Sequence, residues 1–141
     1  RVAGGQNIQG HLTWIEAGTT ANEGREIRIG HNLGVLDLNR WPTDQEIRDP
    51  NVSVQTDTWH CIQFFFDNEP EEARVWLDGQ ETALGTPDFT AQGGAVDNNQ
   101  APQTDWMPPF EAIRFGWELQ GGGVVNFDEI ALGSDFIECN Q

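Results

Sequence analysis

Two runs of aromatic and β-branched residues, 59–67 and 73–79, constrain the fold more than any other feature of the sequence. A polar segment that contains a proline separates them, and this arrangement is typical of a β-hairpin. The second run ends in Asp78-Gly79, a pair that favours positive φ and predicts a tight turn into residues 80–84. The sequence therefore predicts a three-stranded antiparallel meander, which we place in the middle of one sheet.

The two faces of this meander differ in chemistry, because side chains alternate between the faces of a strand. One face is entirely apolar and is expected to face the core; its members are Ile62, Phe64, Phe66, Val75 and Leu77. The opposite face mixes aromatic rings with hydrogen-bonding groups, namely Gln63, Phe65, Arg74 and Trp76. Rings that pack on sugar C–H groups, beside groups that bond hydroxyls, suit a glycan ligand. An aromatic cluster beneath a loop would show the same pattern.

The rest of the chain predicts short strands and no helix. About nine or ten strands with Gly, Pro and Asp turns predict one antiparallel β-sandwich of jelly-roll type over residues 1–141. Loops are expected at 40–50 and at 86–109, the second long enough to be a binding loop. The further strands are predicted at residues 11–17, 25–31, 33–38, 52–56, 110–119, 124–132 and 135–139.

The net charge of −16, with arginine but no lysine, limits the partners of the chain. Nucleic acid and anionic membranes are disfavoured because phosphate binding needs basic patches. No run approaches the roughly 20 apolar residues of a membrane helix. An acidic surface fits a secreted protein or a salty environment, and it leaves carboxylates for calcium. The numbering begins at Arg1 without a leader, so we expect a longer precursor.

The only two cysteines, Cys61 and Cys139, leave three alternatives open. They could form one disulfide between a central and a C-terminal strand, remain two buried thiols, or pair with a cysteine in a missing N-terminal segment. They cannot form a four-ligand zinc site by themselves.

Four motifs occur in an order that resembles a known family. They are Trp59-His60-Cys61, Arg74-Val75-Trp76-Leu77-Asp78-Gly79, Phe110-Glu111-Ala112-Ile113-Arg114-Phe115-Gly116-Trp117 and Phe127-Asp128-Glu129-Ile130-Ala131-Leu132-Gly133. The order resembles the C-terminal two-thirds of concanavalin A-like (lectin/glucanase) jelly rolls. More narrowly, it resembles secreted bacterial relatives of the fungal cellulose-induced, glucuronan-lyase-like family. The resemblance covers residues 11–139 and implies a polysaccharide ligand; since such jelly rolls are usually longer, it also implies missing N-terminal strands.

The resemblance also implies polysaccharide lyase chemistry on uronic-acid chains. β-Elimination needs a group that neutralises the carboxylate, a base and an acid. The catalytic candidates are Arg28, Gln63 and His31; Arg74 and Arg114 are further neutralisers and His60 an alternative base. The acid in such folds is commonly a tyrosine, and this chain has none. Glycan binding is therefore our first hypothesis, a lyase the second, and a structural or adhesion domain the third.

Further residues complete these hypotheses. In the resembled family an acidic residue on the last long strand helps to hold a structural calcium ion, which implies Asp128, with Glu129 as the alternative; both could equally be solvated. The carboxylate spacing of jelly-roll glucanases is absent, which disfavours a glycoside hydrolase. Trp41 and Trp106, in predicted loops, either flank a groove or anchor those loops. The glycan-binding candidates are Gln63, Phe65, Arg74, Trp76, Arg114 and Glu118.

Overall fold

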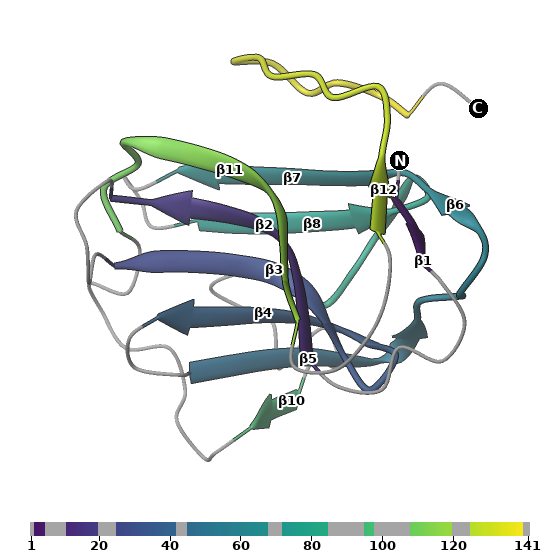
Figure 1. Cartoon of the computed structure of the whole chain (residues 1–141). Helices are drawn as coiled ribbons and strands as arrows, with labels where there is room; N and C mark the ends of the chain where they lie inside the picture. The colour runs from purple at the N-terminus through teal and green to yellow at the C-terminus, as the bar shows by residue number, and fades with distance from the viewer. Residues whose placement is uncertain are drawn as a thin grey trace.

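The computed structural model describes residues 2–4, 11–19, 25–41, 45–67, 72–84, 95–97, 108–119 and 125–139. In these residues it contains strands and no helix, and so no helix that could cross a membrane. The strands form antiparallel sheets that pack face to face (Figure 1). The predicted all-β, antiparallel sandwich is confirmed.

The largest sheet has six strands in the order β10-β5-β4-β3-β2-β11, and each neighbouring pair is antiparallel. Its strands are β2 (His11–Gly18), β3 (Glu26–Asn32), β4 (Val35–Trp41), β5 (Gln45–Ser53), β10 (Ala95–Asp97) and β11 (Ala112–Leu119). β2 bulges at Trp14, where the register with β3 shifts. Gly30 of β3 is needed there, because a Cβ atom would lie 1.7 Å from the carbonyl oxygen of Leu12.

Two three-stranded sheets complete the sandwich. One has the order β7-β8-β9 and the other the order β12-β1-β6. The six strands are β1 (Val2–Gly4), β6 (Trp59–His60), β7 (Ile62–Asp67), β8 (Glu72–Leu77), β9 (Gln80–Glu81) and β12 (Val125–Phe127).

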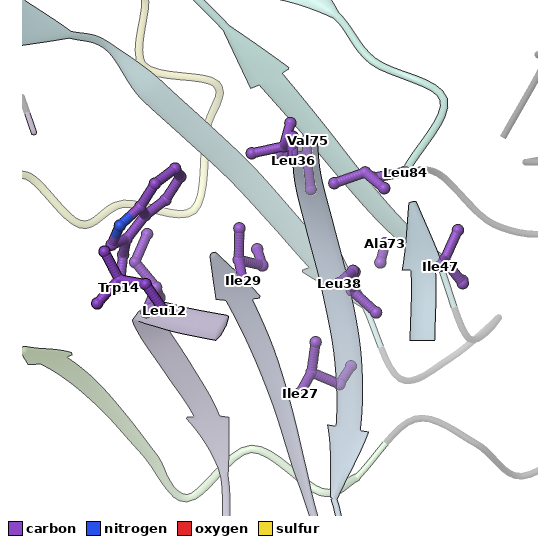
Figure 2. Packing of buried hydrophobic residues seen from close by; sticks show 11 residues of the cluster. Leu12, Trp14, Ile27, Ile29, Leu36, Leu38, Ile47, Ala73, Val75 and Leu84 are labelled. Carbon is purple, nitrogen blue, oxygen red and sulfur yellow. The ribbon is translucent and has the colours of Figure 1, made fainter. Parts of the chain in front are cut away.

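The core lies between the six-stranded sheet and β7–β8 (Figure 2). Ile27, Ile29 and Leu36 are fully buried in it and belong to one cluster with Ala73 and Val75 of β8. Each such aliphatic side chain contributes about 1.5–3 kcal/mol on burial. The apolar face predicted for the meander is confirmed, since its five members lie in the core cluster, pack against it or are buried.

Two tight turns between neighbouring strands of the described residues use positive φ angles. Asp78 and Gly79, with φ of 52° and 79°, join β8 to β9, as the sequence predicts. Leu33 and Gly34, with φ of 52° and 84°, join β3 to β4. Paired positive φ angles match the right-handed twist of the strands they join.

Four predictions of local structure are wrong. The first is the strand at 52–56, of which only residues 52 and 53 are strand, at the end of β5. The meander forms a sheet of its own, with β7 at its edge, and is not the middle of a larger sheet. The loop predicted at 40–50 is largely strand: β5 carries charges because one of its faces is polar, and Pro50 falls where the β4–β5 register shifts. The C-terminal stretch forms a strand only at β12, and residues 128–139 follow as an irregular segment. Most of the loop predicted at 86–109 lies outside the described residues.

Candidate functional site

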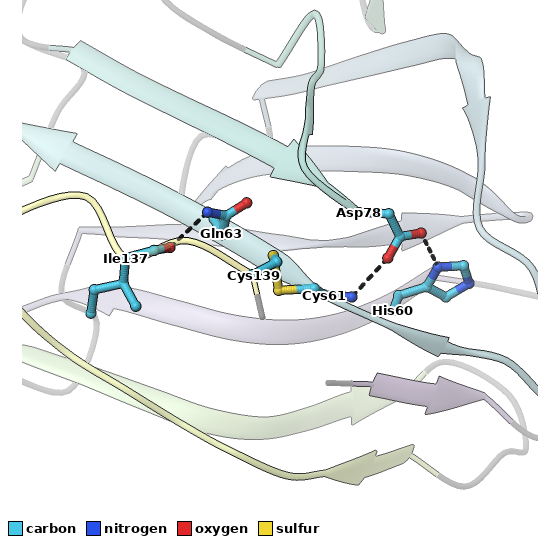
Figure 3. The surroundings of a disulfide bond; sticks show 6 residues. All are labelled: His60, Cys61, Gln63, Asp78, Ile137 and Cys139. Carbon is cyan, nitrogen blue, oxygen red and sulfur yellow. Dashed lines mark hydrogen bonds and ion pairs between the residues drawn. A yellow bond between two sulfur atoms is a disulfide. The ribbon is translucent and has the colours of Figure 1, made fainter. Parts of the chain in front are cut away.

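The outer face of β7–β8 carries Gln63, Phe65, Arg74 and Trp76 together, as the alternation predicts. Residues 128–139, here called the C-terminal strap, lie against this face. A disulfide joins Cys139 to Cys61, and Gln63 Nε2 donates a hydrogen bond to the carbonyl oxygen of Ile137 at 2.7 Å (Figure 3). Phe136 meets the Trp76 ring edge to face, with 5.1 Å between centroids. The intrachain disulfide is thus the alternative that the structure contains.

A groove of about 1150 Å³ lies between the strap and β7–β8. Its lining includes Phe65, Trp76, Ile113 and Phe136, so the groove is rich in apolar surface. Several polar groups beside it are engaged within the chain, although Gln63 Oε1 has no hydrogen-bond partner among the described residues. Arg74 donates two hydrogen bonds, both 2.7 Å long, to the carboxylate of Glu81. This face therefore offers few unsatisfied groups to a sugar.

The second candidate surface is the polar face of the six-stranded sheet, on the side away from the core. The strand register places one row of polar residues across five strands. The order of that row is Arg114 of β11, Glu16 of β2, Arg28 of β3, Asn39 of β4 and Glu46 of β5. Arg114 pairs with Glu16 and, at 3.2 Å, with Glu26, while Arg28 donates to Glu26 at 3.1 Å. The β11, β2 and β3 part of the row is therefore a network of opposite charges, and Glu46 at the β5 end pairs with Arg48.

Trp41, the last residue of β4, stands at one end of this polar face. Its ring is 40 % exposed, and the guanidinium of Arg28 lies 4.9 Å from the ring centroid. The ring is flat, accessible and held by a cation–π contact. The sequence predicted Trp41 in a loop, and this prediction is wrong because β4 extends through it. The side chain of Trp106 lies outside the described residues.

The other end of the polar face is buried and acidic. His11 Nε2 lies 2.9 Å from Asp37 Oδ2, and Glu46 accepts hydrogen bonds from Arg48 at 2.8 Å and from Asn32 at 3.1 Å. Burial raises the pKa of Asp37 to about 7, despite the contact with His11. Burial also opposes ionisation of Glu46, but its hydrogen bonds from Arg48, Asp37 and Asn32 outweigh it and lower the pKa to about 2.

The structure does not bring the three predicted catalytic residues together. Arg28 lies on the polar face, whereas His31 lies on the core side of the same strand and contacts Trp14. Burial, followed by the nearby charge of His11, lowers the pKa of His31 to about 4, and its Nδ1 accepts a hydrogen bond from the Gly34 amide. Gln63 lies in the other sheet. His31 is therefore a neutral structural residue near pH 7.

The alternative base, His60, also has a structural role. Its Nδ1 lies 2.7 Å from Asp78 Oδ2, and its Nε2 lies 3.0 Å from the carbonyl oxygen of Gln55. Asp78 also accepts a hydrogen bond from the Cys61 amide at 2.8 Å (Figure 3). Both ring nitrogens are engaged, so His60 connects the Asp-Gly turn to the backbone at Gln55.

The remaining predicted site residues fall on different surfaces. Arg114 is on the polar face, apart from the Gln63 and Trp76 face with which the sequence grouped it. Glu118 pairs with Thr13 through the backbone of β11, and its side chain is outside the described part. Asp128 and Glu129 are exposed at the start of the strap, where Asp128 Oδ1 accepts a hydrogen bond from the Glu129 amide at 2.9 Å. Their two carboxylates offer up to four of the six to eight oxygens that calcium takes, so calcium binding there stays a prediction.

Sequence reasoning missed the buried part of the polar face. Within the described residues, one group of three His, Cys, Asp or Glu side chains converges closely enough for a metal ion, and it consists of His11, Asp37 and Glu46. A signal was available, because Asp37 and Asn39 alternate with buried leucines in β4. This alternation places both polar side chains on one face, opposite the core.

Comparison with known proteins identifies the family. A family model described as polysaccharide-lyase-like, Cip1-like, core domain, matches residues 5–135, in agreement with the resemblance noted in the sequence. No curated protein and no solved structure matches the chain. Because the family model covers nearly the whole sequence, the chain belongs to the Cip1-like, polysaccharide-lyase-like family.

Proposed function

We propose that this chain binds polysaccharide along the polar face of its six-stranded sheet. The observation that carries the proposal is the exposed ring of Trp41, which contacts Arg28 beside the row of hydrogen-bonding side chains. Sugar rings pack on flat aromatic surfaces, while carboxylates, amides and guanidinium groups bond hydroxyls. Membership of a polysaccharide-lyase-like family supports the same class of ligand.

The charge balance of the polar face supports an acidic or neutral glycan in spite of the net charge of −16. Three of the seven arginines, Arg28, Arg48 and Arg114, gather on this face and are matched there by three glutamates. Arg114 is 48 % exposed and lies at the rim. A guanidinium can bind a uronate carboxylate through two parallel hydrogen bonds. We therefore expect uronic-acid polymers to bind more tightly than neutral ones.

The test is affinity electrophoresis in gels that contain alginate, glucuronan, pectin or hydroxyethyl cellulose. We expect the wild-type chain to be retarded by at least one uronic-acid polymer. The variant Trp41→Ala should lose affinity roughly tenfold, because an aromatic stacking contact contributes about that factor. Trp59→Ala is the matched control, since Trp59 is 47 % exposed but lies in β6, away from the polar face.

Two results would refute the proposal. One is a wild-type chain that migrates unchanged in every polymer. The other is a Trp41→Ala variant that remains folded by circular dichroism and binds as tightly as the wild type. Equal losses in Trp41→Ala and Trp59→Ala would point to nonspecific contacts of exposed tryptophans and would count against the polar face.

A second candidate function is β-elimination on the same face. It is favoured by the position of His11, which is 24 % exposed and is held by Asp37 in the vicinity of Arg48. In this reaction an arginine would neutralise the uronate carboxylate and His11 would take the C5 proton. Absorbance near 230 nm reports the unsaturated product. An absorbance that does not rise with alginate, glucuronan or pectin would exclude the lyase candidate and would leave the binding proposal unaffected.

Secretion and calcium binding remain part of the proposal. The disulfide between Cys61 and Cys139 supports an oxidising compartment, because disulfides rarely persist in the cytosol. A structural calcium ion on Asp128 and Glu129 would connect β12 to the strap. Removal of calcium with EGTA should then lower the melting temperature, and Asp128→Asn should abolish the difference.

A further inference from the structure

The polar face contains a cluster of potential metal-binding side chains that glycan binding does not explain. His11 comes from β2, Asp37 from β4 and Glu46 from β5, and one ligand atom of each lies within 4.8 Å of the other two. β3 passes between β2 and β4, and its residue opposite Asp37 is Gly30. Because glycine has no side chain, His11 and Asp37 can meet across that strand.

The environment of Asp37 is a second, independent observation that points to a bound ion. Its side chain is 99 % buried, yet among the described residues neither of its carboxylate oxygens accepts a well-oriented hydrogen bond. The 2.9 Å approach of His11 Nε2 is an ion-pair contact outside hydrogen-bond geometry. A buried carboxylate whose oxygens accept no well-oriented hydrogen bond is costly, and native structures rarely keep one without an explanation.

The surroundings of Glu46 suit a metal ligand. Arg48 and Asn32 each donate to one of its carboxylate oxygens, which fixes the orientation of the group and leaves a lone pair on each oxygen. Hydrogen bonds of this kind commonly orient metal ligands in proteins. Two ionised carboxylates and one neutral imidazole around a divalent ion also sum to no net charge, which lowers the cost of burial.

We propose that His11, Asp37 and Glu46 bind one divalent first-row transition-metal ion, with zinc preferred over manganese. Ligands at about 2.0–2.2 Å from a common centre lie roughly 3.3–3.6 Å apart in tetrahedral geometry, and small side-chain rotations bring the three atoms to that spacing. The imidazole disfavours calcium and magnesium, which take oxygen ligands. Three protein ligands leave a fourth position open for water or a sugar oxygen.

This site is distinct from the calcium predicted at Asp128 and does not depend on glycan binding. It does exclude one role of His11. A neutral imidazole that binds a metal through Nε2 carries its proton on Nδ1, so neither ring nitrogen can accept a proton from a substrate. Zinc and the His11 base of the lyase candidate are therefore alternatives. Added zinc would suppress β-elimination by that base.

The test uses tag-free protein that has been stripped with EDTA and dialysed. We titrate the protein with Zn²⁺, Mn²⁺ and Ca²⁺ at pH 7.5 by isothermal titration calorimetry. One zinc ion should bind per chain, manganese should bind more weakly, and calcium should not bind at this site. Zinc should also raise the melting temperature, since it binds the folded state. Asp37→Asn should weaken zinc binding at least tenfold. Glu26→Gln is the control, because Glu26 is a buried carboxylate of the same face outside the cluster.

His11→Ala is a second test variant in case Asp37→Asn does not fold. His11 is partly exposed, so its replacement should leave the fold intact. It should also weaken zinc binding at least tenfold. The proposal is overturned if the wild type binds no stoichiometric zinc, if calcium binds this cluster more tightly than zinc, or if His11→Ala binds zinc as the wild type does. A melting temperature that rises in Asp37→Asn, with no zinc effect in either chain, would indicate a proton shared between Asp37 and Glu46 and would also overturn it.

Discussion

Two tryptophan–arginine pairs of this protein have the same local geometry and different surroundings. Arg28 lies 4.9 Å from the ring of Trp41 on the polar face, and Arg74 lies 4.9 Å from the ring of Trp76 on the outer face of β7–β8. The Trp76 ring also contacts Phe136 of the strap. The same pair of residue types is therefore open on one sheet and packed against the chain itself on the other. A local motif alone does not identify a ligand site.

The largest effect should come from the disulfide that holds the strap over Trp76. Replacing both cysteines, Cys61→Ser with Cys139→Ser, should lower the free energy of unfolding by about 4 kcal/mol, because the bond closes a long loop. The two cysteines are 78 residues apart in the sequence. Urea denaturation measures the change. Phe136→Ala is the control, as it removes one strap contact and keeps the bond; a loss under about 1 kcal/mol in the double variant would contradict the expected constraint.

The second largest effect concerns the pH dependence of stability, which should depend on His31 on the core side of β3. His31 has a folded pKa of about 4, below its ordinary value of 6.5, so the unfolded chain takes up a proton first as the pH falls. The stability that neutral His31 provides is complete above pH 6.5 and is lost between pH 6.5 and 4. Relative to His31→Phe, the wild type should lose about 3 kcal/mol over that interval.

Unfolding free energies of both chains at pH 7, 5.5 and 4 test this expectation. The difference between the chains cancels the contribution of Asp37, whose raised pKa acts in the opposite direction over much of the same interval. A difference that is independent of pH would show that His31 titrates normally, and it would then be a candidate for the solvent-accessible chemistry that the sequence suggested.

The third effect decides between the two tryptophans directly. Trp76→Ala removes the edge-to-face contact with Phe136 and should lower the free energy of unfolding by about 1–2 kcal/mol. Because the strap occupies this face, polysaccharide affinity should stay within about twofold of the wild type. A tenfold loss of affinity in a folded Trp76→Ala chain would indicate that the glycan binds to the outer face of β7–β8, as the sequence suggested.

What the sequence predicts well here depends on neighbours along the chain. The apolar side of the meander follows from strict alternation, and the Asp78-Gly79 turn follows from the φ angles that these residues tolerate. Both signals lie within a few residues, so no knowledge of distant segments is needed. The family resemblance adds the order of motifs, and the family match agrees with it.

What the sequence does not predict depends on pairing between distant segments. Arg114 and Glu16 are neighbours only because β11 pairs with β2, and the charges of β5 look like those of a loop until β4 and β10 flank it. The strap has apolar residues at strand-like spacing. Its position is fixed by a disulfide and side-chain contacts, and no strand ladder forms there among the described residues. Register and covalent closure therefore determine the candidate site more than local propensity does.

The smallest effects should come from a matched pair of exposed arginines. Arg114 on the polar face and Arg74 on the outer face of β7–β8 are 48 % and 41 % exposed, and each is paired with glutamates. Exposed ion pairs contribute little to stability, so Arg114→Gln and Arg74→Gln should each shift the melting temperature by no more than about 2 °C.

Their effects on ligand binding should differ. Arg114→Gln should weaken binding of alginate or glucuronan about fivefold, since a rim guanidinium that can reach a uronate carboxylate is lost, and should leave binding of a neutral polymer unchanged. Arg74→Gln should change neither, because Arg74 lies on the outer face of β7–β8, apart from the proposed glycan surface. Affinity electrophoresis at two salt concentrations measures both variants. If the two substitutions weaken uronate binding equally, long-range charge alone governs binding, and the result contradicts a uronate site on the polar face.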